Sequence, residues 1–364
     1  MIGRTLFGYI ARLFLRWIVG LFLGTLLLIF LIDLLELLRS VSSQDGFDLG
    51  TVMVISAFRV PSISEQVLPF AVLLGSMAAL LTLSRRSELA VSRAAGLSVW
   101  QFTAPGIAVA LAIGVIATTA YNPLATTLKA ESDRMAASGA AGRMGSLLSD
   151  ISSETWLRQH TEEGDAVIKV AGIAEEGRVL VQPVIWMFGR DGMLKQRIEA
   201  SRATLGDGVF QLTDARVHEV SGEPRSAPEM TLPTALTARQ ISQRLASPSA
   251  VSFWRLPDMI AQSANAGLPP ARFQLQYDVL LLRPALLAAM VLIATTVSLG
   301  MSRKGNAGRM ILGGVTAGFM LYVVTEIFGD LGSEGLVPPL LAAAAPAFIA
   351  LTLGATVLLF QEDG

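Results

Sequence analysis

The sequence predicts an α-helical membrane protein with six transmembrane helices, three on each side of an inserted β-jellyroll domain. The composition is too apolar for a soluble protein, because 52% of the 364 residues are hydrophobic and only 16% are charged, against about 25% charged in soluble domains. The charges are also concentrated, since 32 of the 57 lie within residues 125–270. Outside that segment, six apolar stretches approach the roughly 20 residues that cross a bilayer core.

The predicted spans cover residues 15–38, 62–83, 99–120, 277–301, 310–328 and 337–360. The stretch 49–58 is apolar too, but it reaches only about half way across a membrane. We therefore expect it to form an interfacial helix that leads into the second span. These boundaries divide the chain into a first transmembrane half (1–124), a central domain with helical connections (125–272) and a second transmembrane half (273–364).

Basic residues indicate the orientation, because short cytoplasmic loops carry an excess of Lys and Arg. They cluster at the N-terminus and after the second and fourth spans, as Arg4, Arg12, Arg16, Arg85, Arg86, Arg93, Arg303, Lys304 and Arg309. The loop between spans five and six carries only Asp330 and Glu334. We expect both termini to be cytoplasmic and the central domain to lie outside, in the periplasm of a Gram-negative cell.

The central domain alternates strand-like runs with turn signals. The runs are 155–157, 166–170, 179–188, 209–212 and 215–220, and the turns are Glu163-Gly164-Asp165, Arg190-Asp191-Gly192 and Gly206-Asp207-Gly208. Asp-Gly between β-prone runs is typical of hairpins, which favours a sandwich or jellyroll over a parallel sheet. Residues 125–150 and 237–270 are expected to be helical or irregular.

Several function classes are disfavoured by composition and motifs. A net charge of −1 gives no global electrostatic basis for binding nucleic acid, and the absence of Cys excludes disulfides and thiolate metal sites. No phosphate-binding loop, H-E-x-x-H or G-x-S-x-G motif is present. His160 and His218 are expected to be surface residues. We predict no catalytic residue, metal or cofactor, and no ATPase activity of the chain itself.

Ionisable residues within spans are costly and often functional. Asp33 and Glu36 lie near the outer end of span one, and Glu326 near the outer end of span five, where an interfacial position is expected. Arg283 lies inside span four, directly before Pro284, with no opposite charge near it in sequence. Its charge must be neutralised by a carboxylate or an anionic ligand, or the side chain must reach the headgroup region by snorkelling, and the sequence favours neither interpretation.

The loop 84–98 predicts a short cytoplasmic helix. Ser87 is a good N-cap, Glu88 follows it in the first turn, and Gly96 suits a left-handed C-terminal stop. The helix is either a solvated connection or a docking element whose packing stripe consists of Leu89, Ala90 and Ala94.

The chain resembles the LptF/LptG family of lipopolysaccharide export permeases over nearly its whole length. The residues that carry the resemblance are Val60-Pro61, Pro69-Phe70-Ala71-Val72-Leu73-Leu74-Gly75, Arg86-Ser87-Glu88-Leu89, Ala95-Gly96, Arg272-Phe273-Gln274-Leu275, Pro284, Tyr322, Ile327-Phe328-Gly329, Pro338-Pro339 and Pro346. The ends of spans five and six resemble the G member more than the F member.

The resemblance implies a permease of the bacterial inner membrane that pairs with an LptF-like paralogue and docks on an LptB-like cytoplasmic ATPase dimer. Such a permease extracts lipopolysaccharide and passes it through periplasmic jellyrolls, with an LptC-like single-span protein, to an LptA-like bridge. It also implies that the loop 84–98 holds the coupling helix, with Glu88, Arg85, Arg86 and Leu89 contacting the ATPase.

The resemblance further suggests lipid contacts at Arg39, Arg283, Phe70 and Leu73. The chain departs from the family near the outer end of span one. Family members often carry lysines there, whereas this chain carries Asp33 and Glu36.

Three alternative functions agree less well with the sequence. A MacB-type permease places its outer domain after the first span. A proton-coupled transporter that uses Asp33, Glu36 and Arg283 as a relay needs carboxylates deep in the membrane, whereas these are shallow. A lipid-modifying enzyme needs a nucleophile and base, which these motifs do not supply.

Overall fold

The computed structural model describes residues 3–41, 49–138 and 155–363, apart from gaps at 162–163, 171, 175–177, 190–192, 207, 220–224, 235–240, 242–247, 266–268 and 303–306. The chain divides into two compact units. A helical unit comprises Met1–Leu37, Val52–Ala130 and Pro248–Gly364, and a sheet unit comprises Leu38–Thr51 and Glu131–Ser247. Of the predicted central domain, residues 125–130 and 248–272 therefore belong to the helical unit, and the remainder to the sheet unit.

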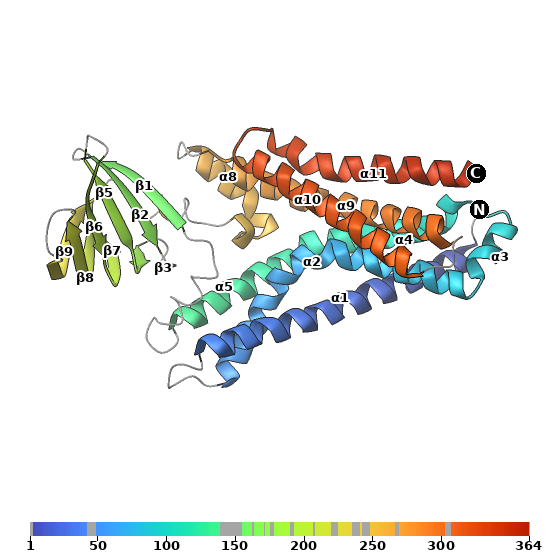
Figure 1. Ribbon diagram of the computed structural model, residues 1–364, viewed down its shortest axis with the longest axis horizontal. Coiled ribbons are helices and arrows are strands. Elements are labelled where there is room, and N and C mark those ends of the chain that lie inside the picture. The colour runs from blue at the N-terminus through green and yellow to red at the C-terminus, as the bar shows by residue number, and fades with distance from the viewer. Residues whose placement is uncertain are drawn as a thin grey trace. The chain divides into compact units, whose positions relative to one another are not determined.

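The helical unit contains the long helices that Figure 1 shows side by side. Its elements are α1 (Arg4–Val41), α2 (Leu49–Arg85), α3 (Glu88–Ala94), α4 (Val99–Ile116), the π-helix η1 (Ala117–Tyr121), α5 (Asn122–Ser138), η4 (Pro248–Ala250), η5 (Phe253–Arg255), α8 (Leu256–Asn265), α9 (Ala271–Ser302), α10 (Ala307–Ser333) and α11 (Pro339–Asp363). Within the described residues, six helical stretches are long and apolar enough to cross a membrane. The six predicted spans are confirmed.

The separate interfacial helix expected at 49–58 is wrong. α2 runs without interruption from Leu49 to Arg85, through Pro61 and Pro69. Transmembrane helices tolerate proline because nearby side chains and neighbouring helices satisfy the freed backbone groups. The third span is also longer than expected, because α4, η1 and α5 follow one another directly.

The core of the helical unit draws buried residues from α1, α2, α4, α9, α10 and α11. Ile10, Phe14 and Ile18 on α1 are buried at four-residue spacing, as one face of a helix requires. A side chain at Gly75 would bring its Cβ within 2.7 Å of the Ile18 backbone, and one at Gly106 within 2.6 Å of the Phe14 ring. These two glycines allow α1 to approach α2 and α4 closely.

The sheet unit is a nine-stranded antiparallel sheet with the order β1-β2-β5-β6-β8-β7-β4-β3, and β9 pairs with β8. Its strands, shown in Figure 1, are β1 (Thr155–Thr161), β2 (Gly164–Val170), β3 (Gly172–Ala174), β4 (Val179–Val181), β5 (Val184–Phe188), β6 (Leu194–Glu199), β7 (Arg202–Leu205), β8 (Val209–Glu219) and β9 (Arg225–Pro233). The long strand β8 pairs with β9 along one edge, and with β7 and then β6 along the other. This jellyroll-like sheet confirms the predicted fold class.

The strand boundaries differ in two places from those expected. The run 179–188 splits into β4 and β5, because Gln182 adopts a left-handed conformation with φ of 46°. The runs 209–212 and 215–220 join into the single strand β8, although Asp214 within it has φ of 54°. Gly208, with φ of 75°, lies in the β7–β8 connection as expected. The turn 190–192 lies outside the described residues.

Candidate functional site

The short helix α3 begins at Glu88 and ends where expected. Gly96 has φ of 81°, and its N–H donates to the Arg93 carbonyl at 3.0 Å. The Leu97 N–H donates to the Ser92 carbonyl at 3.1 Å. These two bonds form a Schellman motif, which satisfies the last carbonyls of α3.

The N-cap predicted at Ser87 is wrong. Ser87 has φ of 59° and its side chain makes no capping hydrogen bond. Its N–H donates to the Ser84 carbonyl at 3.0 Å, so the chain reverses within two residues of the end of α2. An N-cap residue needs an extended backbone, which this tight turn does not allow.

The Glu88 carboxylate is held by the first helix. The Tyr9 hydroxyl lies 3.1 Å from Oε1 and 3.0 Å from Oε2 of Glu88. Arg86 Nη1 lies 3.8 Å from Oε1, and the Arg86 side chain is 62% exposed. Arg85 is exposed as well. The basic residues and the carboxylate therefore share one accessible end of the helical unit.

The predicted packing stripe of α3 divides in two. Leu89 is half-buried and packs against the helical core, whereas Ala90 and Ala94 are exposed. No residue of α3 is fully buried. One side of α3 is thus anchored on the chain's own core, and the other side is open.

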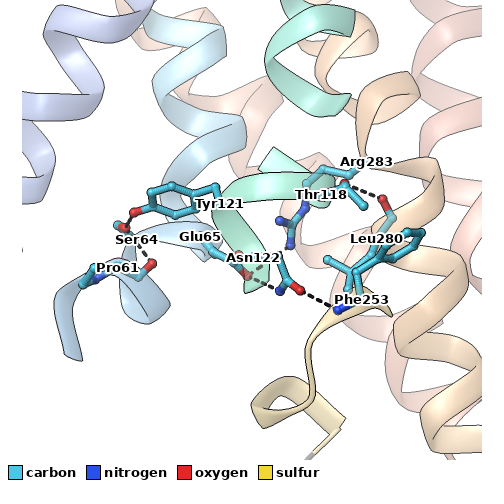
Figure 2. Close-up of polar contacts among 9 residues, drawn as sticks. All are labelled: Pro61, Ser64, Glu65, Thr118, Tyr121, Asn122, Phe253, Leu280 and Arg283. Atoms are coloured by element: carbon cyan, nitrogen blue, oxygen red, sulfur yellow. Dashed lines mark hydrogen bonds and ion pairs between the residues drawn. The ribbon is translucent and has the colours of Figure 1, made fainter. Parts of the chain in front are cut away.

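A polar cluster joins three long helices within the membrane-spanning region (Figure 2). Glu65 on α2 accepts a hydrogen bond from Asn122 Nδ2 at 3.1 Å. The same oxygen, Oε2, lies 3.5 Å from Arg283 Nη2 on α9, and both side chains are only 13% exposed. Glu65 Oε1 and Arg283 Nη1 are buried and have no hydrogen-bond partner among the described residues.

The π-helix η1 arranges the neighbours of this cluster. Tyr121 Oη lies 2.6 Å from Ser64 Oγ, and the Thr118 hydroxyl donates to the Leu280 carbonyl at 2.7 Å (Figure 2). Asn122 Oδ1 accepts from the Phe253 N–H at 2.9 Å. π-Helical turns are rare overall, but many of those known occur at functional sites. Here the turn and Asn122 directly after it place side chains against α2, α9 and η5.

The cluster lies about one hydrocarbon thickness from the α3 end of the unit. About 20 residues separate Glu65 from Arg85, and about 19 separate Arg283 from Ser302. At 1.5 Å per residue these segments are about 30 Å long, which matches the thickness of a bilayer core.

A model of the family described as lipopolysaccharide export system permease LptF/LptG matches residues 8–360. The chain belongs to the LptF/LptG family. It is 24% identical over 335 residues to the lipopolysaccharide export system permease protein LptG of Haemophilus influenzae, with 89% of each chain covered. It is 25% identical over 321 residues to the LptG protein of Escherichia coli K12, with 84% of this chain and 83% of that one covered.

These comparisons make the chain an LptG-like permease subunit of a lipopolysaccharide export ABC transporter and a multi-pass protein of the bacterial inner membrane. Nearly the whole chain takes part in both matches. The family assignment therefore covers the helical unit and the sheet unit alike.

Asp33, which stands where this LptG-like chain departs from the family resemblance, is buried and paired. It lies 3.6 Å from Arg59 Nη1 on α2, and the two side chains are 9% and 15% exposed. Glu36 and Arg39 are exposed further along α1. Asp33 is therefore a packed residue and does not face open water.

Three of the four predicted lipid contacts lie in the helical unit, and two of them, Phe70 and Leu73, lie beside Gly318 on α10. Arg283 is engaged with Glu65. The Phe70 ring lies 5.8 Å from the Tyr322 ring on α10. Leu73 is fully buried, and a Cβ at Gly318 would approach its Cδ2 to 2.4 Å. Lipid contact by these residues and by Arg39 stays a prediction.

Sequence reasoning missed Tyr9, Arg59, Glu65 and Asn122. Glu65 is a charged residue inside the predicted second span, a signal that was available from the sequence. Arg59 gives the same signal only once α2 is taken as one continuous helix. Tyr9 and Asn122 carry no comparable signal. Among the described residues, no group of His, Cys, Asp and Glu is able to hold a metal ion.

Proposed function

We propose that this LptG-like permease couples to a cytoplasmic ATPase dimer through α3, pairs with an LptF-like permease, and delivers lipopolysaccharide to a periplasmic bridge. The observation that carries this proposal is the fixed carboxylate of Glu88. Glu88 is the first residue of α3. This helix packs on the core through Leu89, ends at Gly96 and is exposed at Ala90 and Ala94.

The proposed orientation rests on the charged residues around α3. Arg85, Arg86 and Arg93 lie next to or within this helix, and basic loops favour the cytoplasmic side. An ATP-binding subunit then meets α3 in the cytoplasm. The sheet unit follows the odd-numbered third span, so it belongs to the periplasm, where LptC-like and LptA-like partners extend the path for lipid.

The proposed lipid path passes the outer part of the membrane. The Glu65–Arg283 cluster is about 30 Å from the α3 end, level with the outer headgroups in this orientation. Arg39 and Arg283 are the basic residues proposed to meet anionic headgroup oxygens, and Phe70 and Leu73 the apolar residues proposed to meet acyl chains. A proton relay is disfavoured, because Asp33 and Arg283 are each engaged in an ion pair, with Arg59 and Glu65 respectively.

The experiment changes Glu88 in the reconstituted complex and measures lipopolysaccharide release per ATP hydrolysed. A charge pair across a partly buried interface is worth about 2 kcal/mol, so we expect Glu88→Ala to reduce transport by about 30-fold. Glu88→Asp should give a partial defect, and Glu88→Lys the largest.

The matched control is Glu334→Ala, which removes an exposed carboxylate paired with Arg272 at 3.3 Å on a loop far from α3 in sequence. Transport at the wild-type rate by Glu88→Lys, with the ATPase still bound, would show that coupling runs through another element.

A further inference from the structure

We propose that Tyr9 is a positioning residue that fixes the Glu88 carboxylate and joins the coupling helix α3 to the first span. This inference rests on the proposed function, in which Glu88 contacts the ATPase. It adds a second helix to the coupling element, and a residue 79 positions away from Glu88 in the chain.

The geometry is that of one hydroxyl shared by both carboxylate oxygens. Tyr9 Oη lies 3.1 Å from Oε1 and 3.0 Å from Oε2, so its single proton lies between them. A hydrogen bond to an ionised acceptor is stronger than a neutral one. It uses a small part of the acceptor capacity of a carboxylate. Glu88, whose side chain is 35% exposed, therefore remains able to accept from a basic or N–H group of a docked subunit.

Both partners stand next to residues that are anchored in one core. Ile10 follows Tyr9 and is 3% exposed in the helical core. Leu89 follows Glu88 and packs against the same core. Neither backbone is free to move far, so the hydroxyl closes a connection between two positioned segments. This limits the carboxylate to one direction.

The connection leads to α1, whose apolar window is the least buried among the six spans found in the described residues. Only 11% of the apolar window of α1 is buried, against 56% for α2. A displacement of α3 acts on α2 through the chain itself, because the two helices are consecutive. It acts on α1 at this point through Tyr9. The hydroxyl thus gives ATP-driven movement of α3 a direct route to α1.

The test is Tyr9→Phe in the complete complex, in proteoliposomes that contain lipopolysaccharide. The change removes one oxygen and keeps the ring. We expect about a five-fold loss of lipopolysaccharide released per ATP hydrolysed, the effect of one hydrogen bond to a charged group in a partly exposed place, while the ATPase subunit still copurifies. Tyr277→Phe is the matched control, because it removes the same atom from a ring that stacks on Phe253.

A double-mutant cycle separates positioning from general stability. If Tyr9 acts through the carboxylate, Tyr9→Phe causes no further loss in a Glu88→Ala background, where no side-chain acceptor remains. A Tyr9→Phe complex within two-fold of wild type, or a loss that multiplies with that of Glu88→Ala, overturns the inference. A Glu88→Ala complex with wild-type transport instead overturns the proposed function, so the two failures are distinct.

Discussion

The buried pair between α2 and α9 allows a quantitative test of how the helical unit is held together. The perturbation is Glu65→Gln, which keeps the length of the side chain and its ability to accept from Asn122 but removes the charge opposite Arg283. The structure gives one contact of 3.5 Å between the charged groups, with both side chains 13% exposed. The arginine would then be left buried without a counter-charge.

Removing one partner of a buried pair costs about 3 to 5 kcal/mol, largely because the other charge stays unpaired. The contact here is long and not bidentate, and Arg283 Nη1 has no partner among the described residues. We therefore expect the low end, about 3 kcal/mol, for Glu65→Gln and for Arg283→Gln alike. The double variant should cost less than either single variant, because no unpaired charge remains.

The assay is equilibrium unfolding of the purified chain in mixed detergent micelles, with Glu36→Gln as the control at an exposed position. An Arg283→Gln cost under about 0.5 kcal/mol, the range of ordinary surface substitutions, would refute the reasoning and show that the contact with Glu65 does not stabilise the helical unit. The exchanged pair Glu65→Arg with Arg283→Glu keeps opposite charges. If Arg283 contacts lipid, this variant should remain stable and lose lipopolysaccharide cross-linking.

Three further predictions follow from other contacts. Gly114→Ala should destabilise the helical unit by about 2 kcal/mol, because the added Cβ would lie 2.4 Å from the Pro284 Cα. The control Gly329→Ala, where a Cβ would meet nothing within 4 Å, should leave the midpoint of unfolding unchanged. Asp33→Asn should cost about 3 kcal/mol in the same assay by unpairing Arg59, and a smaller cost than that of Glu36→Gln would contradict burial of the pair. Deleting residues 150–235 should preserve membrane insertion and copurification of the ATPase but abolish transfer of lipid to a periplasmic acceptor, and continued transfer would refute the bridge role of the sheet.

The spans and the sheet were predictable because their signals are repeated many times along each element. A window of apolar residues does not depend on which residue pairs with which, so six spans follow from hydropathy alone. The alternation of strands and turns likewise predicts an antiparallel sheet without its order. The separate helix expected before the second span failed because the stretch 49–58 was judged by its own length, whereas α2 continues from it through Pro61 and Pro69 into the span.

Features of the candidate site could be predicted from the sequence only where they depend on residues close together in the chain. Gly96 ends α3 because a left-handed residue is needed within that turn, and glycine adopts it without strain. Ser87 fails as a cap because the tight return from α2 decides its backbone conformation. The partners of Glu88 and Arg283 lie 79 and 218 residues away. No short motif encodes such pairs, and only the packing of the helices brings them together.

The contacts of α1 differ in strength along its length. Near Asp33 the helix is tied to α2 by an ion pair whose side chains are 9% and 15% exposed, and separating a pair of this kind costs several kcal/mol. Near Tyr9 it is tied to α3 by a single hydrogen bond to a carboxylate that is 35% exposed, where water replaces a lost partner at low cost. Ile10, Phe14 and Ile18 hold the same end of α1 in the helical core, so the hydrogen bond to Glu88 can break without that end leaving the core. The less costly of these two polar contacts is therefore the one beside Glu88, where the ATPase is proposed to act.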